Sequence, residues 1–223
     1  MDEYVHKVIR LRPLAARITG SEVYRKFFAA APGLPELVLL GRMRAYSLET
    51  DPRSTPRWQT IIVDCPSSGH GLLMLETPFA AFRAVSVGPF ARLASQIMVW
   101  LQEDARVALV AIPEEMAVVE AIEFKDDLLE TTGLSPTFAF LNRMRQETLS
   151  AAAHLALTEV DATKGSRDLF LLDGARRAQR RTRLEAFHHR RLEKGLGLSP
   201  LIIGELANCR PATVAAALSG ESL

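Results

Sequence analysis

Apolar residues near the start of the chain recur at three- and four-residue steps, the spacing of an amphipathic α-helix. One such stripe consists of Tyr4, Val8, Leu11, Ala15 and Ile18. Gly20 and Ser21 end this helix and cap a second one, which the segment APGLP at 31–35 ends in turn. Pro35 suits the first turn of a third helix. The pattern therefore predicts three helices, followed by a polar, proline-containing connector at 50–57.

After the connector, the apolar positions form short continuous runs, which are typical of strands buried on both faces of a sheet. The runs are WQTIIVD (58–64), RVALVAI (106–112), TFAFL (137–141) and LIIGEL (201–206). A helical stretch follows each of them, most clearly at 114–131, between Pro113 and Gly133. This alternation predicts an α/β fold whose parallel sheet carries helices on both faces.

A further helical pattern, rich in Leu, Met and Phe, lies between His70 and Glu103. Flexible apolar side chains on helices can line an adaptable groove for an apolar client. The same side chains can equally form the internal core of a helical subdomain. The sequence leaves both interpretations open.

Composition and charge narrow the class of protein. The 223 residues are 48% hydrophobic and 24% charged with a net charge of +1, which suits a globular domain and gives no global attraction to nucleic acid. The two cysteines, Cys65 and Cys209, lie far apart, which favours a reducing compartment over a disulfide framework. Neither a signal peptide nor a run of membrane-spanning length is recognisable, so we expect a cytoplasmic protein and not an integral membrane protein.

Asp64 is the most specific candidate for a catalytic residue, because it ends a predicted strand. Parallel sheets bind ligands at the carboxyl ends of their strands. A carboxylate there can hold a magnesium-bound water. Ser67, Ser68 and Gly69 would form a short loop whose N–H groups face a phosphate, and His70 could contact the same group. Alternatively, Asp64 only caps the turn or helix that follows.

Glu114 and Asn142 follow two other predicted strands and should lie at the same edge of the sheet. The amide of Asn142 can both donate to and accept from an adenine edge. Each residue also has an ordinary structural role. Acids in a first helical turn complement the helix dipole, and asparagine is a common turn residue.

Basic residues gather at 176–183 and 188–191. A helix with these residues on one face can contact phosphates, an acidic partner or a membrane surface. Alternatively, the basic residues only form a solvated face. We expect no nucleic-acid binding, because interleaved aromatic residues and a recognisable reading fold are missing.

Several segments, taken in order, resemble the anion-transporting ATPase family, which includes the arsenite pump-driving ATPases and the ATPase that targets tail-anchored membrane proteins. VDCPSSGH (63–70) resembles the family's switch II, and AIPEEMAVVEAIEF (111–124) resembles its strand followed by a Pro-Glu helix. FAFLNRM (138–144) is similar to the strand that ends in the adenine-reading asparagine. PGLPELVLLGRM (32–43) and GLLMLETPFAAF (71–82) resemble the helical insert around switch II.

The resemblance implies a partial parallel sheet of a P-loop-NTPase-like, SIMIBI-type domain with a helical insert subdomain. Residues 1–56 would be the first part of the insert, and 57–223 the C-terminal part of the ATPase-like domain, with further insert helices at 71–104. Asp64 would organise Mg²⁺ and water, Asn142 would read adenine, and Glu114 would lie at the nucleotide edge near a subunit interface. The resemblance also implies a homo- or heterodimer and an apolar helical client.

The chain departs from the family in one decisive respect, because the phosphate-loop pattern G-x-x-x-x-G-K-[ST] occurs nowhere in it. The family's Cys-x-x-Cys zinc site is also absent, so we expect no zinc. Met1 aligns where a full-length relative would already be entering its insert. We therefore expect the C-terminal portion of an ATPase, with ATP and Mg²⁺ bound only if a partner or an N-terminal portion supplies the loop.

The absent first strand would be the centre of the sheet, so we expect exposed strand edges and low stability in the isolated chain. Two alternatives remain open: a pseudo-ATPase subunit that regulates a complete relative, and a helical protein-binding module that does not use nucleotide.

Overall fold

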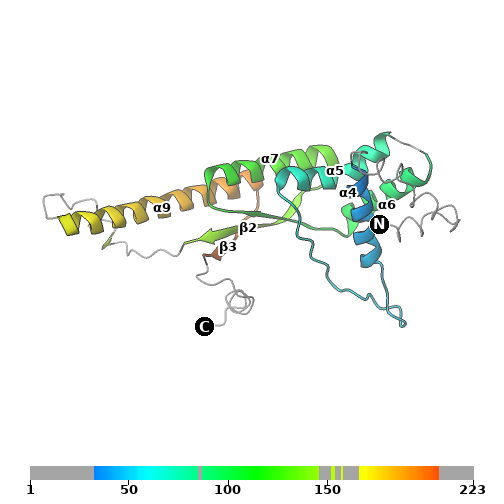
Figure 1. Ribbon diagram of the computed structural model, residues 1–223, viewed down its shortest axis with the longest axis horizontal. Helices are drawn as coiled ribbons and strands as arrows, with labels where there is room; N and C mark the ends of the chain where they lie inside the picture. Colours follow the sequence, from blue (N-terminus) through cyan, green and yellow to red (C-terminus); the bar gives the residue numbers. More distant parts are fainter. Residues whose placement is uncertain (1–32, 85–86, 146–151, 154–156, 158–165, 206–223) are drawn as a thin grey trace, which may run out of the picture. The chain divides into compact units, whose positions relative to one another are not determined.

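The computed structural model describes residues 33–84, 87–145, 152–153, 157 and 166–205 (Figure 1). The chain divides into a helical unit (residues 1–106 and 126–135) and a sheet unit (residues 107–125 and 136–223). The helices predicted around 4–18 and 21–28 lie outside the described residues.

The helical unit contains α4 (Leu34–Ser47), α5 (Ser68–Ala84), α6 (Pro89–Glu103) and the end of α7 (Glu115–Thr132). Gly33 precedes α4 with a φ of 81°, a conformation that glycine adopts without strain, and Pro35 lies in the first turn as expected. The buried apolar side chains of the unit include Leu37, Leu40, Met74, Phe79, Ile97, Leu101 and Leu128. The Leu- and Phe-rich block thus supplies much of the core of this unit.

The sheet unit contains a parallel three-stranded sheet in the order β1-β2-β3. The strands are β1 (Val107–Ala111), β2 (Pro136–Met144) and β3 (Leu201–Gly204), and α9 (Ser166–Leu196) precedes β3. In the register, Ala111 lies beside Leu141, and Leu141 lies beside Ile202. Three of the four predicted strands and their parallel arrangement are therefore confirmed.

Helices α7 and α9 cover one face of this sheet (Figure 1). The core between them consists of Ala111, Val118, Ala121, Ala139, Leu141, Leu192 and Leu196. Both connections are helical crossovers between neighbouring strands, and right-handed crossovers that run in one direction place their helices on the same face.

The other face of the sheet has no helical layer among the described residues. Val110 is 64% exposed and Phe138 is 49% exposed there, although parallel sheets are normally buried on both faces. The expected cover on both faces is thus present on one face only in the described part of the chain.

The prediction of a strand at 58–64 is wrong for this structure, because the segment is irregular and exposed. Ile62 is 90% exposed, and Ile61 and Val63 are also exposed. A run rich in β-branched residues becomes a strand only when a neighbouring strand supplies ladder hydrogen bonds and a covering layer buries its side chains. Neither occurs here in the described residues.

Two glycines of α9 provide a matched test of the packing between α9 and α7. A Cβ at Gly195 would lie 2.6 Å from Cγ1 of Ile122 on α7, whereas a Cβ at Gly174 would meet nothing within 4 Å. We predict that Gly195→Ala lowers the free energy of unfolding by about 1–3 kcal/mol through overpacking. Gly174→Ala should raise it by roughly 0.5–1 kcal/mol, because alanine favours the helix. Urea denaturation measures both, and an equal effect of the two substitutions would contradict this close approach.

Candidate functional site

The segment after Asp64 begins a helix and does not form the expected phosphate-facing loop. Helix α5 starts at Ser68, so Ser68, Gly69 and His70 lie in its first turn. The carbonyl oxygen of Ser67 accepts a hydrogen bond from the N–H of Gly71 at 2.8 Å, which closes this turn. The first N–H groups of a helix have no partner within it, so they can still face an anion.

Asp64 and Cys65 lie in the exposed segment ahead of α5, and Asp64 does not end a strand in this structure. The pKa of the Cys65 thiol is raised by partial desolvation and by the neighbouring Asp64 carboxylate. The thiol is therefore protonated at neutral pH, which fits an unreactive cysteine better than a nucleophile.

Glu114 lies between β1 and α7 in the sheet unit. Its N–H donates to the carbonyl oxygen of Ile112 at 2.8 Å, and its own carbonyl oxygen accepts from the N–H of Val118 at 3.0 Å. Glu114 is therefore the residue immediately before α7, whose carbonyl oxygen accepts the first hydrogen bond of the helix, and its side chain is exposed. At this position the carboxylate complements the helix dipole, and its exposure leaves it accessible to a ligand.

Asn142 lies in β2, close to the carboxyl end of the strand, and is partly buried. Since β1 and β2 are parallel neighbours with Ala111 beside Leu141, Asn142 and Glu114 lie at the same edge of the sheet. Both predicted residues therefore lie at the end of the sheet where α/β sheets bind ligands. Asp64 and the start of α5 belong to the helical unit, which forms a separate group of candidates.

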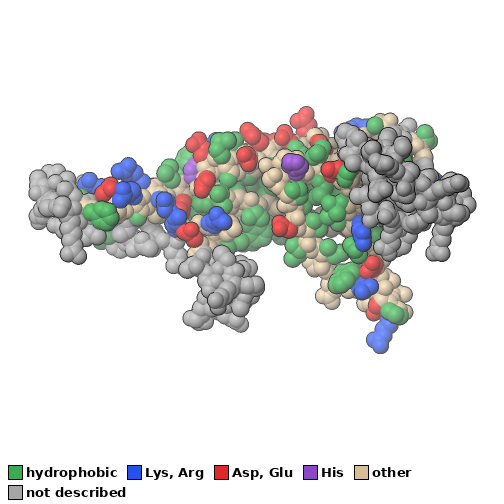
Figure 2. Space-filling model, viewed as in Figure 1, with side chains coloured by type: hydrophobic (Ala, Val, Ile, Leu, Met, Phe, Trp, Pro, Cys, Tyr) green, Lys and Arg blue, Asp and Glu red, His purple; other side chains and the backbone are tan. Residues whose placement is uncertain are grey.

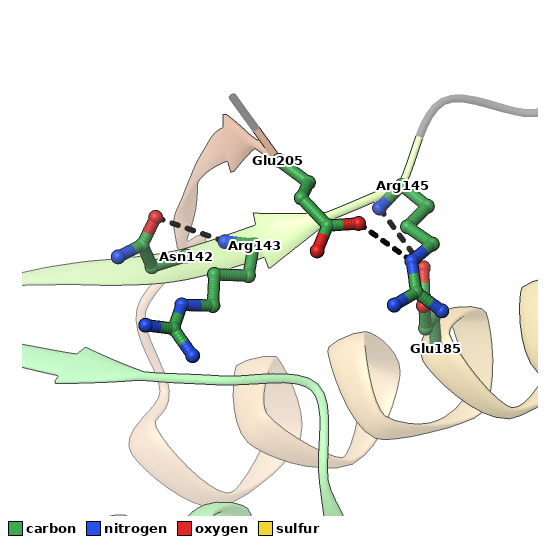
Figure 3. A network of polar contacts seen from close by, with 5 residues as sticks. All are labelled: Asn142, Arg143, Arg145, Glu185 and Glu205. Atoms are coloured by element: carbon green, nitrogen blue, oxygen red, sulfur yellow. Dashed lines mark hydrogen bonds and ion pairs between the residues drawn. The ribbon is translucent and has the colours of Figure 1, made fainter. Parts of the chain in front are cut away.

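The Oδ1 atom of Asn142 accepts a hydrogen bond from the backbone N–H of Arg143 at 2.9 Å (Figure 3). Arg143 has a φ of 60°, an uncommon conformation for a residue with a side chain. The amide nitrogen of Asn142 points away from Arg143 in Figure 3. It is the group of this side chain that can donate to a ligand.

A polar network that the sequence did not predict lies beside Asn142 (Figure 3). The Nε atom of Arg145 lies 2.6 Å from Oε2 of Glu205, and the backbone N–H of Arg145 donates to Oε2 of Glu185 at 3.1 Å. The network joins the ends of β2 and β3 to the buried Glu185 of α9. No local motif indicates it, because its members are 40 and 60 residues apart in the chain.

The electrostatics of the network favour its charged form. The hydrogen bond from Arg145 lowers the pKa of Glu205, and the charges of Arg145 and Arg143 lower it further. The pKa of Arg145 is raised, chiefly by its hydrogen bond to Glu205. Arg145 is paired with Glu205, and the exposed side chain of Arg143 is a second cation at this edge that a ligand can reach.

The edge therefore offers an amide donor on Asn142, a guanidinium on Arg143 and a carboxylate on Glu114. These groups can bind and orient a polar ligand. Among the residues that the structure describes, no group of three or more His, Cys, Asp or Glu side chains could hold a metal ion. In the same part of the chain, no helix is long and apolar enough to cross a bilayer.

No model of a known protein family matches this chain, and no curated protein matches it. The family resemblance therefore rests on the motifs of the sequence.

The ion pair of Arg145 leads to a prediction about the titration of Glu205. In Arg145→Gln, we expect the pKa of Glu205 to rise towards the ordinary glutamate value, because the largest cause of its lowering is removed. Carbon-13 NMR of the side-chain carboxyls across an acid titration measures the change. Arg53→Gln, at an exposed arginine of the helical unit, is the control and should leave the pKa of Glu205 unchanged.

The lowered pKa also gives the sign of a pH effect on stability. A carboxyl whose pKa is lower in the folded state stabilises the fold above its unfolded pKa, and this contribution is lost as the pH falls through the folded pKa. The contribution of Glu205 should therefore disappear on acidification below its ordinary pKa of 4.5. In the NMR titration of Arg145→Gln, an unchanged pKa of Glu205 would show that the ion pair between Arg145 and Glu205 is not formed in solution.

Proposed function

We propose that this chain is the C-terminal portion of an anion-transporting ATPase-like protein, in which ATP binding and hydrolysis are coupled to a helical subdomain that binds a client or partner. A second polypeptide, or a further portion of the same one, supplies the glycine-rich phosphate loop. Without that loop the chain does not hydrolyse ATP.

The observation that supports this proposal best is the exposed apolar run that precedes Asp64. Ile61, Ile62 and Val63 are β-branched and exposed, and the described residues offer them no neighbouring strand. Burying such side chains is worth about 1.5–3 kcal/mol each, so an element that covered them would stabilise the protein. A switch II segment whose neighbouring strand lies outside the chain would have this property.

The outer strand β1 of the described sheet provides a second, independent observation in support of the proposed function. β1 (VALVA) lies at an edge, is wholly apolar, and carries no charge or proline within the strand. Natural edge strands are normally protected by such residues against pairing with other chains. In the described part of the chain this edge is unprotected, which suits a strand that pairs with a further strand.

The polar groups at the carboxyl ends of the strands would supply the nucleotide contacts. Asn142 would read adenine through its amide, and Glu114 would lie at the nucleotide edge near a dimer interface. In the helical unit, Asp64 would organise the magnesium and its water. The first-turn N–H groups of Ser68, Gly69 and His70 would face a phosphate. We place the protein in the cytoplasm, since its two cysteines lie far apart and fit a reducing compartment.

The phosphate loop dominates the energetics of catalysis. Phosphoryl transfer depends on positioning and on electrostatic stabilisation of the transferred group. One oxyanion-type donor contributes roughly 3–4 kcal/mol to such stabilisation, and several are lost together without the loop. Because the phosphate-loop pattern is missing from the chain, a pseudo-ATPase subunit is an alternative function. Such a subunit would pair with a complete relative and regulate it.

A nucleotide-independent helical binding module is the other alternative, and one observation favours it. The helical unit exposes large apolar side chains on α4, α5 and α6, which could contact an apolar client. They are Leu39, Leu73, Phe82, Phe90 and Val99.

Calorimetry with ATP and ADP separates these functions. The chain alone should show no hydrolysis, and binding should appear when the phosphate-loop-containing N-terminal portion of a full-length relative is added. In that complex, Asp64→Asn should abolish most hydrolysis while binding persists, and Asn142→Ala should weaken binding about 5- to 100-fold through lost hydrogen bonds. Arg53→Gln is the control. Absence of binding in both conditions would leave the helical binding module, and hydrolysis by the lone chain would contradict the need for a separate loop.

Hydrogen exchange tests the supporting observation directly. The backbone amides of Ile61, Ile62 and Val63 should exchange freely in the isolated chain, because no described partner accepts from them. They should become protected when the complementing portion is added. The amides of Leu141, in the interior of β2, should be protected in both states and so provide the internal reference. Unchanged exchange at 61–63 in a complex that forms would contradict the proposed neighbouring strand.

A further inference from the structure

Helix α9 carries a charge that the rest of the chain does not share. It contains nine of the 27 Lys and Arg residues of the chain but four of its 26 Asp and Glu residues. The chain as a whole has a net charge of +1, so the positive charge is concentrated on this one element. Figure 2 shows blue side chains gathered along α9.

Most of the basic residues of α9 lie along one side of the helix, whereas Arg181 falls on the side of Glu185 and Leu192. The basic residues on that side recur at alternating four- and three-residue steps and so form a stripe. One phenylalanine lies in the same row, and three further residues flank it. We define the basic stripe as Arg176, Arg180, Arg183, Phe187, Arg190 and Lys194, flanked by Arg177, Leu184 and Arg191. At 1.5 Å per residue the stripe is about 27 Å long.

The stripe lies on the outer side of α9. In the second half of the helix, the buried residues Glu185, His188, Leu192 and Leu196 recur on the side that packs towards the sheet. They are offset by roughly half a turn from Phe187, Arg190 and Lys194. The stripe therefore points away from the core of the sheet unit.

Several cations of the stripe have no countercharge in the described part of the chain. Arg180, Arg183, Arg190 and Lys194 are exposed and form no ion pair there. Arg177 pairs with Asp173 at 2.7 Å, and Arg191 lies 3.8 Å from Glu115.

The acids of this part of α9 do not neutralise the stripe. Glu185 accepts from the backbone of Arg145, and Glu193 accepts from the hydroxyl of Ser199 at 3.0 Å. Like charges at these spacings repel one another along a helix, and a bound polyanion would remove that repulsion.

One exposed apolar side chain belongs to the stripe, and a second flanks it. Phe187 is 51% exposed and Leu184 is 57% exposed, and both are surrounded along the helix by arginines. Arginine-rich helices that also present Phe and Leu are typical of attachment to the interface of an acidic bilayer. The arginines meet the headgroup phosphates, and the apolar side chains enter the boundary of the acyl region.

We propose that the basic stripe of α9 docks this protein peripherally on a membrane surface rich in acidic phospholipids. A straight stripe matches a plane of anionic headgroups, and the bilayer accepts Leu184 and Phe187, which a nucleic-acid backbone has no means to bury. Each basic residue near such a surface strengthens binding about fivefold. The inference does not depend on the proposed ATPase function, because it uses no nucleotide and none of the residues at the sheet edge.

Sedimentation of the full chain with vesicles tests the proposal. Binding is expected to vesicles of equal parts phosphatidylcholine and phosphatidylserine, to be absent with phosphatidylcholine alone, and to weaken as sodium chloride is raised. Arg180→Gln/Arg183→Gln should lower the partition coefficient about 25-fold. Arg53→Gln/Arg92→Gln removes the same charge from exposed sites in the helical unit and should change it little. Equal losses in the two double variants would overturn the assignment to α9.

Phe187→Ser separates the apolar contact from the charge. It should weaken binding to the acidic vesicles several-fold without altering the dependence on salt, whereas Arg180→Gln/Arg183→Gln should make that dependence shallower. Circular dichroism confirms that each variant is folded. Binding to a duplex oligonucleotide that is stronger than binding to the vesicles, and that is unaffected by Phe187→Ser, would overturn the lipid assignment in favour of nucleic acid.

Discussion

The packing of α7 and α9 against one face of the parallel sheet is the contact on which the sheet unit depends. Val118 of α7, Leu141 of β2 and Leu192 of α9 are almost fully buried there, and Gly195 lets α9 approach Ile122 of α7 closely. Both helices lie on this face because their crossovers run in the same direction. In the described part of the chain, the opposite face and the edge at β1 are left uncovered as a consequence.

These uncovered surfaces connect the fold to the proposed function. A parallel sheet normally buries both faces and protects its edges, whereas Val110 and Phe138 are exposed on one face in the described part of the chain, as expected of a sheet that a further element covers. The exposed run before Asp64 has the same implication within the helical unit. A nucleotide hydrolase that obtains its phosphate loop from elsewhere would account for both.

Helix α9 has two different roles on its two sides. Its inner side supplies Leu192 and Leu196 to the core and Glu185 to the network with Arg145. Its outer side carries most of the basic residues of a helix with nine Lys and Arg against four Asp and Glu, in a chain whose net charge is +1. The inner contacts hold the second half of the helix against the sheet, and the helical spacing keeps the outer cations on one line.

Local sequence determined the helices α4 to α7 and the strands β1, β2 and β3, because their apolar spacing, prolines and glycines act over a few residues. It also placed Asn142 and Glu114 at one edge, since parallel neighbouring strands share their carboxyl ends. Only the tertiary structure decided the fate of 58–64, where strand propensity had no neighbour to pair with. It likewise decided the network of Arg145, Glu185 and Glu205, which long-range folding brings together and no local pattern encodes.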